Sequence, residues 1–176
     1  MTFPDLFFSR FLVVLVIFEY FADGQQWVYQ NAKQAYLKSA KVPSGYTRAE
    51  LERGFLTTGL WRYSRHPNFA AEQAIWLTLY QWACWECETF YNWTFVGAFG
   101  YLALFQASTW FTELITSGKY AEYEVYQQRV GKFVPKLVGS GWDEEWMEKE
   151  GPKIQERVRA RERAVKTFGR NGAKTQ

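Results

Sequence analysis

The chain has 176 residues, of which 48% are hydrophobic and 20% aromatic, and nine of them are Trp. This exceeds what a water-soluble core of this length needs, so we expect part of the surface to face something other than water. The net charge of +3, from 21 Lys and Arg against 18 Asp and Glu, is too small to indicate that the chain binds nucleic acid.

Three segments of the chain are apolar enough to be considered as membrane-spanning helices: residues 6–22, 68–85 and 93–111. The first contains an apolar run bounded by Arg10 and Glu19, the second carries Glu72 as its single charge, and the third carries no charge. A spanning helix needs about 20 mostly apolar residues, and Trp residues gather at the ends of these segments. We therefore predict an all-α integral membrane bundle with about three membrane helices.

A polar linker, residues 33–58, separates the first two apolar segments. Its sequence TRAELERG predicts a short helix, because Thr47 and Glu50 form a capping box and Gly54 suits a left-handed stop. The linker and the residues that follow carry these basic side chains: Lys33, Lys38, Lys41, Arg48, Arg53, Arg62 and Arg65. If loops rich in basic residues stay inside, this side of the bundle faces the cytosol or the mitochondrial matrix.

The sequence GLWRYSRHPNFAAE, residues 59–72, places many hydrogen-bond donors at the start of the second apolar segment. Pro67 fits the first turn of a helix, where the backbone N–H groups and the helix dipole attract an anion. Arg62 and Arg65 add guanidinium groups suited to phosphate, and Tyr63 and Asn68 add neutral hydrogen-bonding groups. The motif therefore predicts a site for a phosphorylated ligand. The alternative is that both arginines are ordinary interfacial anchors.

Three acidic residues are predicted to lie near the same level of the bundle. Glu19 and Asp23 are four residues apart and share one face of the first helix, and Glu72 lies in the first turns of the second. Acids on apolar helices need a polar partner. They either line the ligand site or pair with Arg62 or Arg65 to hold the helices together.

The residues after the third apolar segment are polar and charged. The sequence KYAEYEVYQQRVGKFVPKL, residues 119–137, alternates Tyr and charge at helical spacing and predicts an interfacial helix that stops near Pro135. Beyond it, WDEEWMEKE is strongly acidic and residues 153–176 are strongly basic. We predict a membrane domain over residues 1–137 and a charged, helical C-terminal extension over residues 138–176.

The two cysteines, Cys84 and Cys87, cannot form a disulfide framework. A C-x-x-C pair is compatible with redox chemistry or with half of a zinc site, but the chain has no second pair. We interpret them as two thiols at the polar end of a buried helix and predict no metal site.

Three ordered motifs resemble the steroid 5-alpha-reductase-like membrane proteins, whose relatives include sterol reductases and isoprenylcysteine carboxyl methyltransferases. The stretch GLWRYSRHPNFAAE is similar to the family hallmark, with Phe69 and Ala71 where Tyr and Gly are usual. Upstream, EYFADGQQ resembles the Glu-x-x-Ala-Asp-x-Gln element, and downstream YEVYQQRVGKFVP resembles the closing segment. The resemblance covers roughly residues 12–137.

The resemblance implies the NADPH-binding half of a steroid or lipid double-bond reductase, an oxidoreductase acting on a CH–CH group. It implies a cofactor pocket formed by Glu19, Asp23, Arg62, Tyr63, Arg65, His66, Asn68, Glu72, Tyr126, Arg129 and Lys132. Family members place further helices before the matched part, and in the reductases that half supplies the acid and the tyrosine that polarise the substrate carbonyl. No catalytic residue is therefore assigned here.

Two other functions remain open at this point. The first is a non-catalytic accessory subunit of a large membrane complex, with other membrane subunits and membrane lipid as partners and a phospholipid or a nucleotide in a vestigial pocket. The second is methyl transfer from S-adenosylmethionine, which is implied only by the shared Arg-His-Pro element. For all of these we expect an integral membrane protein of the endoplasmic reticulum or the mitochondrial inner membrane.

Overall fold

The computed structural model of the chain describes residues 2–120, 122–136, 141–154, 156–157 and 160. These residues form helices and short connections, with no strand among them. A further helical segment covers residues 144–154. The named elements are α1 (Phe3–Ser39), α2 (Arg48–Arg53), the 3-10 helix η1 (Gly59–Arg62), α3 (Pro67–Glu86), α4 (Phe95–Lys119) and α5 (Tyr123–Arg129).

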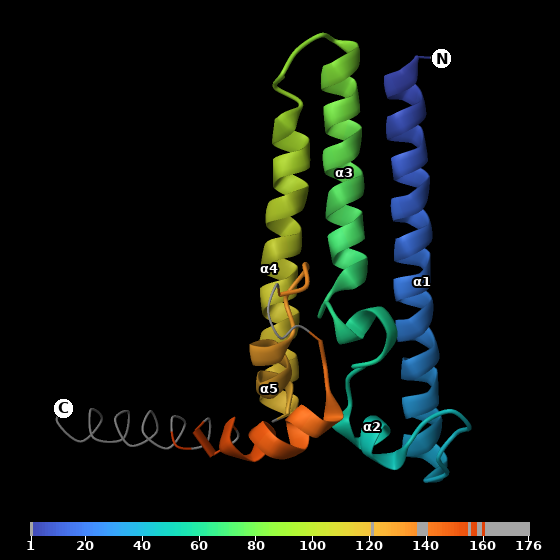
Figure 1. The fold of residues 1–176 in the computed structure, drawn as a ribbon, viewed down its shortest axis with the longest axis vertical. Helices are drawn as coiled ribbons and strands as arrows, with labels where there is room; N and C mark the ends of the chain where they lie inside the picture. The colour runs from blue at the N-terminus through green and yellow to red at the C-terminus, as the bar shows by residue number, and fades with distance from the viewer. Residues whose placement is uncertain (1, 121, 137–140, 155, 158–159, 161–176) are drawn as a thin grey trace, which may run out of the picture.

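The three long helices lie side by side, with α3 between α1 and α4 (Figure 1). The start of α3 lies at the same end of the molecule as the ends of α1 and α4, and α2, α5 and the segment at 144–154 gather there. Most of the sequence motifs fall in this region, which we call the motif end.

Local signals in the sequence explain where the helices begin and stop. The expected short helix forms as α2, with Thr47 and Glu50 in a capping box and Gly54 in the left-handed region at φ 83°. A Cβ atom at Gly54 would lie 2.1 Å from the Tyr120 ring, so only glycine fits this stop. Pro67 occupies the first turn of α3, as its fixed φ favours.

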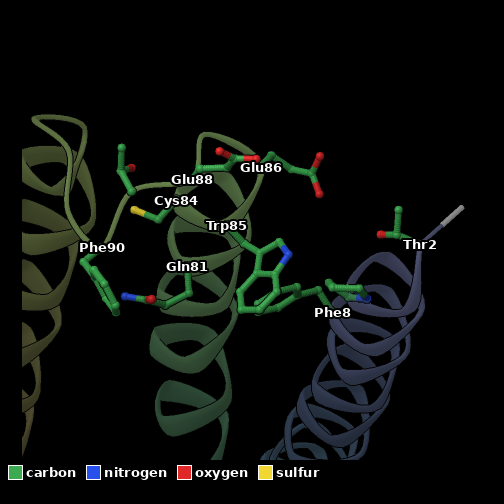
Figure 2. A pocket seen from close by; sticks show the side chains of 10 residues that line it. Thr2, Phe8, Gln81, Cys84, Trp85, Glu86, Glu88 and Phe90 are labelled. Atoms are coloured by element: carbon green, nitrogen blue, oxygen red, sulfur yellow. The ribbon is translucent and has the colours of Figure 1, made fainter.

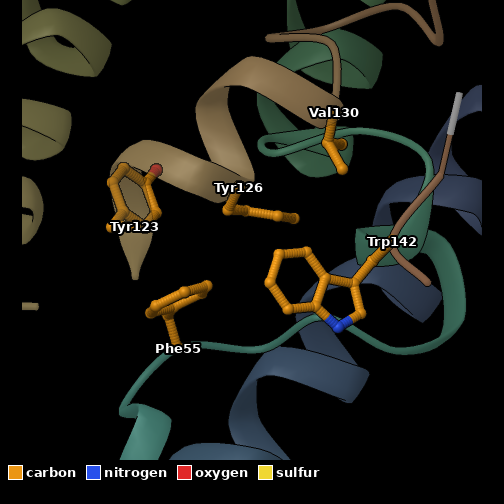
Figure 3. Packing of buried hydrophobic residues seen from close by; sticks show 5 residues of the cluster. All are labelled: Phe55, Tyr123, Tyr126, Val130 and Trp142. Carbon is orange, nitrogen blue, oxygen red and sulfur yellow. The ribbon is translucent and has the colours of Figure 1, made fainter. Parts of the chain in front are cut away.

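Two aromatic clusters pack the motif end. In the first, the rings of Phe55 and Tyr123 meet edge to face at 5.0 Å, and Tyr126 meets Trp142 at 5.7 Å (Figure 3). Trp142 comes from the sequence after α5, so this segment belongs to the packed core at that end. The second cluster consists of Tyr29, Leu51, Leu56 and Trp61.

The prediction of an integral membrane bundle is wrong. Within the part of the chain that the structure describes, no helix combines the length and the apolarity needed to span a bilayer. The apolar run of α1 is short, because Arg10, Glu19 and Asp23 interrupt it. In α3 and α4, many of the residues that appeared apolar are Trp, Tyr, Thr and Gln, whose polar groups weaken partition into hydrocarbon. This finding also overturns the expected location in the endoplasmic reticulum or mitochondrial inner membrane.

Candidate functional site: a buried ion pair and a carboxyl cluster

The start of the motif is anchored to α1. Gly59 has φ 61°, and a Cβ atom there would lie 2.4 Å from Oε1 of Gln25. The same Gln25 oxygen accepts a hydrogen bond from the Leu60 backbone N–H at 2.9 Å. Trp61 Nε1 donates to the Ala22 carbonyl at 3.2 Å. The glycine therefore permits a close approach that fixes the motif against α1.

The end of the motif is anchored to the segment that follows α5. The backbone N–H groups of Arg65 and His66 donate to the carbonyls of Gly131 and Lys132, at 2.9 and 3.0 Å. Ser64 Oγ donates to the Phe133 carbonyl at 2.9 Å. These hydrogen bonds join residues 64–66 to residues 131–133, more than 60 positions away. The backbone of the motif is therefore held in place without a ligand.

Arg65 is buried and its guanidinium is occupied by groups of its own chain. It forms a two-pronged ion pair with Glu113, with Nε to Oε1 at 2.6 Å and Nη2 to Oε2 at 3.2 Å. Its Nη1 donates to the carbonyls of Gln127 and Val130, at 3.0 and 2.6 Å. The residue that we expected to bind phosphate therefore joins the motif to α4 and α5. Its ion-pair partner is Glu113 and not Glu19, Asp23 or Glu72, whose pairing with Arg62 or Arg65 was the alternative interpretation of those three acids.

Glu113, which the sequence analysis did not single out, is the acid that holds this buried group together. Only 8% of its surface is exposed. Burial alone would raise its pKa, but the hydrogen bonds and charges of His66 and Arg65 outweigh burial and lower the pKa to about 2. The available signal was a single acid two residues beyond the predicted third apolar segment, since an acid in such a place requires a buried partner.

His66 and Tyr126 belong to this same buried assembly. His66 Nε2 lies 3.0 Å from Glu113 Oε1, and the His66 ring stacks on Phe69 at 5.5 Å. The Tyr126 hydroxyl donates to the carbonyls of Trp61 and Ser64. Burial raises the pKa of Tyr126 well above its ordinary value, so this side chain holds the motif as a neutral donor.

A second cluster of polar side chains lies where α1 and α3 pack against each other. Asn68 Nδ2 donates to Asp23 Oδ1 at 2.9 Å, and the carboxyl groups of Glu19 and Glu72 lie close enough to shift the pKa of each other. Tyr101, from α4, donates its hydroxyl to Glu72 Oε1 at 2.8 Å. We call the set Glu19, Asp23, Asn68, Glu72 and Tyr101 the carboxyl cluster. Four of these five residues were sequence candidates, and the structure brings them together.

The two glutamates of the carboxyl cluster differ in protonation. Burial, then the hydrogen bond and charge of Glu72, then the charge of Asp23 raise the pKa of Glu19 to about 7. Burial opposes ionisation of Glu72 as well, but hydrogen bonds from Tyr101, Trp76 and Glu19 outweigh it and lower the pKa of Glu72. At neutral pH Glu72 is therefore ionised, and Glu19 is protonated about half of the time.

Among the described residues, two buried acceptor atoms have no hydrogen-bond partner: Asn68 Oδ1 and Gln26 Oε1. A buried acceptor without a donor is unfavourable by roughly 1–3 kcal/mol. Asn68 itself belongs to the carboxyl cluster. These atoms are suited to a ligand that brings hydroxyl or amide donors.

The remaining predicted residues lie outside both groups. Arg62 and Tyr63 are exposed, with the guanidinium 6.0 Å from the Tyr63 ring centre. Arg129 Nε donates to the Gly141 carbonyl at 3.1 Å, and Lys132 Nζ donates to Gln106 Oε1 at 3.3 Å. Of the predicted cationic groups, the exposed Arg62 is therefore the one with the freest access to a ligand.

A cavity of about 660 Å³ lies at the other end of the molecule, between the start of α1 and the end of α3 (Figure 2). Phe8, Trp85 and Phe90 supply aromatic walls, and Glu86 and Glu88 supply carboxylates. Cys84 also lines it and is a free, buried thiol. A helix of 20 residues separates this cavity from the motif, so it is distinct from the carboxyl cluster.

Comparison with known proteins defines the class to which this all-helical chain belongs. Residues 1–130 match the family described as "Protein of unknown function (DUF1295)", and the chain belongs to that family. It is similar to "Uncharacterized protein C594.04c" of Schizosaccharomyces pombe (strain 972 / ATCC 24843), with 45% identity over 131 residues. That match covers 73% of this chain and 38% of the relative, so the chain spans well under half of the relative's length. No solved structure matches the chain.

Proposed function

We propose that this chain is the NADPH-binding part of a reductase that acts on a carbon–carbon double bond of a lipid, as its resemblance to steroid 5-alpha-reductase-like proteins implies. The observation that carries the proposal is the carboxyl cluster. Asp23 and Asn68 lie 45 positions apart in the sequence yet form a direct hydrogen bond beside the Glu19–Glu72 pair. Four of the eleven residues that the resemblance assigns to the cofactor therefore lie together: Glu19, Asp23, Asn68 and Glu72.

The cluster fits the sugar and amide parts of a dinucleotide. Asp23 is exposed, and Asn68 Oδ1 has no donor among the residues that the structure describes. Ribose hydroxyls and the carboxamide of nicotinamide are donors of that kind. Asp23 and Asn68 would hold these groups, and Arg62 would contact a phosphate, because the Arg65 guanidinium is bound within the chain.

The chemistry of the proposed reaction is divided between cofactor and chain. Bound NADPH would supply a hydride. The chain holds the motif rigid through Arg65, Glu113 and Tyr126, which orients Asn68 at the start of α3. Preorganised polar groups of this kind position a ligand without reorganisation when it binds.

Isothermal titration with NADPH tests the proposal. We expect micromolar binding, weakened about tenfold or more in Asn68→Ala and in Asp23→Asn, since each loses a hydrogen bond to the ligand. Asn31→Ala is the matched control, because Asn31 is an exposed asparagine of α1. Absence of heat with the folded wild type, or equal weakening in the control, would contradict the proposal.

A non-catalytic subunit of a larger protein assembly is the second candidate. The observation that favours it is a row of exposed apolar side chains on α1: Phe7, Phe11, Val14, Phe18 and Phe21. Their spacing of four and three residues is that of a helix seam that packs against another helix. Purification of the natural assembly tests this candidate: Phe11→Ser with Phe18→Ser should release the chain, and Lys38→Ser, on the exposed end of α1, should not.

A further inference from the structure

We propose that the cavity between the start of α1 and the end of α3 binds an amphiphilic organic cation, an ammonium group that carries a hydrocarbon chain. The cavity lies at the opposite end of α3 from the carboxyl cluster, so the proposal is independent of the proposed function. It rests on three features of this end of the molecule: aromatic walls, an excess of carboxylates, and an adjoining apolar hollow.

The walls of the cavity are aromatic. Its volume of about 660 Å³ lies in the range of small-molecule sites, and Phe8, Trp85 and Phe90 line it. In Figure 2 the Trp85 indole extends from α3 toward Phe8 of α1. The Phe8 ring also stacks on Trp82 at 6.0 Å, and Trp82 Nε1 donates to Asp5 Oδ1 at 3.3 Å, which joins the two helices here. The faces of Trp and Phe rings attract cations.

The charged side chains around the cavity are acidic. Glu86 and Glu88 line it, and Asp5 lies in the first turn of α1. Residues 2–9 and 80–94, which include every residue that lines the cavity, contain no Lys or Arg. The local charge therefore attracts a cation and disfavours an anion, including a phosphate beside the ammonium group.

The two glutamates occupy places that a helix end disfavours for acids. The last residue of α3 is Glu86, and the last turn of this helix, where the carbonyl groups carry partial negative charge, has no basic residue. Glu88 has φ 51°, in the left-handed region that glycine or asparagine usually occupies after a helix. A positively charged ligand would offset the charge of both the carboxylates and the helix end.

An apolar hollow of about 320 Å³ adjoins the cavity. Its lining residues are Phe3, Pro4, Phe7, Phe8 and Trp85, of which Pro4, Phe8 and Trp85 also line the cavity. None of the five carries a charge, so the hollow suits a hydrocarbon chain. A ligand that fills both spaces therefore has a cationic end and an apolar chain.

Octyltrimethylammonium is the probe, and octyl sulfate is the control ligand with the same chain and the opposite charge. Each is titrated into ¹⁵N-labelled protein below its critical micelle concentration, and the indole N–H signal of Trp85 is followed by NMR. We expect the cation to saturate this signal with a Kd below about 1 mM, and octyl sulfate to bind at least about tenfold more weakly. Tetramethylammonium, which lacks the chain, should also bind at least about tenfold more weakly. No movement of the Trp85 signal, or equal affinity for either control, would overturn the proposal.

Octylphosphocholine separates a simple cation from a lipid headgroup. It has the same chain and ammonium group with a phosphate between them, and the carboxylates of Glu86 and Glu88 repel that phosphate. It should therefore bind at least about fivefold more weakly than octyltrimethylammonium. Equal or tighter binding would overturn the assignment to a cation without a neighbouring anion.

Variants connect binding to the named residues, with isothermal titration as the measurement. Trp85→Ala should weaken binding of octyltrimethylammonium about fivefold or more, whereas Trp27→Ala, at another exposed Trp, should not. Glu86→Gln combined with Glu88→Gln should weaken it about fivefold or more without weakening octyl sulfate, and Glu148→Gln is the matched control. All of these side chains are exposed, so the variants retain the fold. Equal effects in the variants and their controls would overturn the proposal.

Discussion

The buried ion pair and the carboxyl cluster are both built from acidic and polar side chains, but they differ in how far those side chains satisfy one another. Arg65 and Glu113 are 9% and 8% exposed, and the chain supplies a partner for each polar group that they present. In the carboxyl cluster, by contrast, Glu19 and Glu72 repel each other when both are ionised, and Asn68 Oδ1 has no donor within the described part of the chain. Polar groups that satisfy one another build structure, whereas groups left in conflict are available for a ligand or a proton.

The largest expected effect breaks the ion pair. Glu113→Gln leaves the Arg65 charge buried without its counter-charge, which should lower the free energy of unfolding by about 3–5 kcal/mol. Urea denaturation at pH 7 measures this, with Glu148→Gln as a control that changes stability by less than about 0.5 kcal/mol. A loss below about 1 kcal/mol would mean that the pair adds little to the fold.

Acid should remove the difference between wild type and Glu113→Gln. Because the pKa of Glu113 falls from 4.5 to about 2 on folding, its contribution is present above pH 4.5 and is lost as the pH falls toward 2. The loss is on the order of 3 kcal/mol. Urea denaturation at pH 7, 4.5 and 2.5 should show the two proteins converging, and a constant difference would contradict the stated pKa.

Removal of the Tyr126 hydroxyl tests how much its hydrogen bonds to the motif backbone contribute to stability. Tyr126→Phe leaves the Trp61 carbonyl without its side-chain donor and should cost about 1–2 kcal/mol of unfolding free energy. Tyr63→Phe is the matched control, because Tyr63 is exposed, and it should be nearly neutral. Equal effects in both variants would show that the buried hydroxyl has no special role.

The smallest expected effect concerns the carboxyl cluster and has the opposite sign. Folding raises the pKa of Glu19 from 4.5 to about 7, so its contribution to stability is present below pH 4.5 and is lost as the pH rises toward 7. Glu19→Gln should therefore stabilise the protein at pH 8 by less than about 1 kcal/mol, since the pair is partly exposed. Thermal unfolding at pH 8 and pH 4.5 measures it, and destabilisation at pH 8 would contradict the raised pKa of Glu19.

The parts of this structure that follow from short-range signals could be predicted from the sequence. Thr47, Glu50 and Gly54 bound α2, and Pro67 starts α3, because caps and stops depend on neighbouring residues. The resemblance implied that Glu19, Asp23, Asn68 and Glu72 line one pocket, and in the structure Asn68 donates a hydrogen bond to Asp23. The function of the carboxyl cluster stays a prediction.

Long-range partners could not be predicted in the same way. Glu113 is 48 residues from Arg65 in the sequence. At such a separation, the spacing of residues does not indicate which acid will pair with a given arginine. The membrane prediction was wrong for a different reason: the many Trp and Tyr residues were counted as apolar, although their polar groups weaken a spanning helix.

The pairing of the motif with residues 131–133 has a consequence for where this fold can be shortened. The family match stops at residue 130, yet the acceptors for Arg65 N–H, His66 N–H and Ser64 Oγ lie just past that point, and Trp142 N–H donates to the Arg62 carbonyl. A protein cut after residue 130 would retain the motif GLWRYSRHPNFAAE but lose the carbonyl groups that hold its backbone in place. We therefore expect a chain that keeps residues 131–142 to be more stable than one that stops at residue 130, where the family match ends.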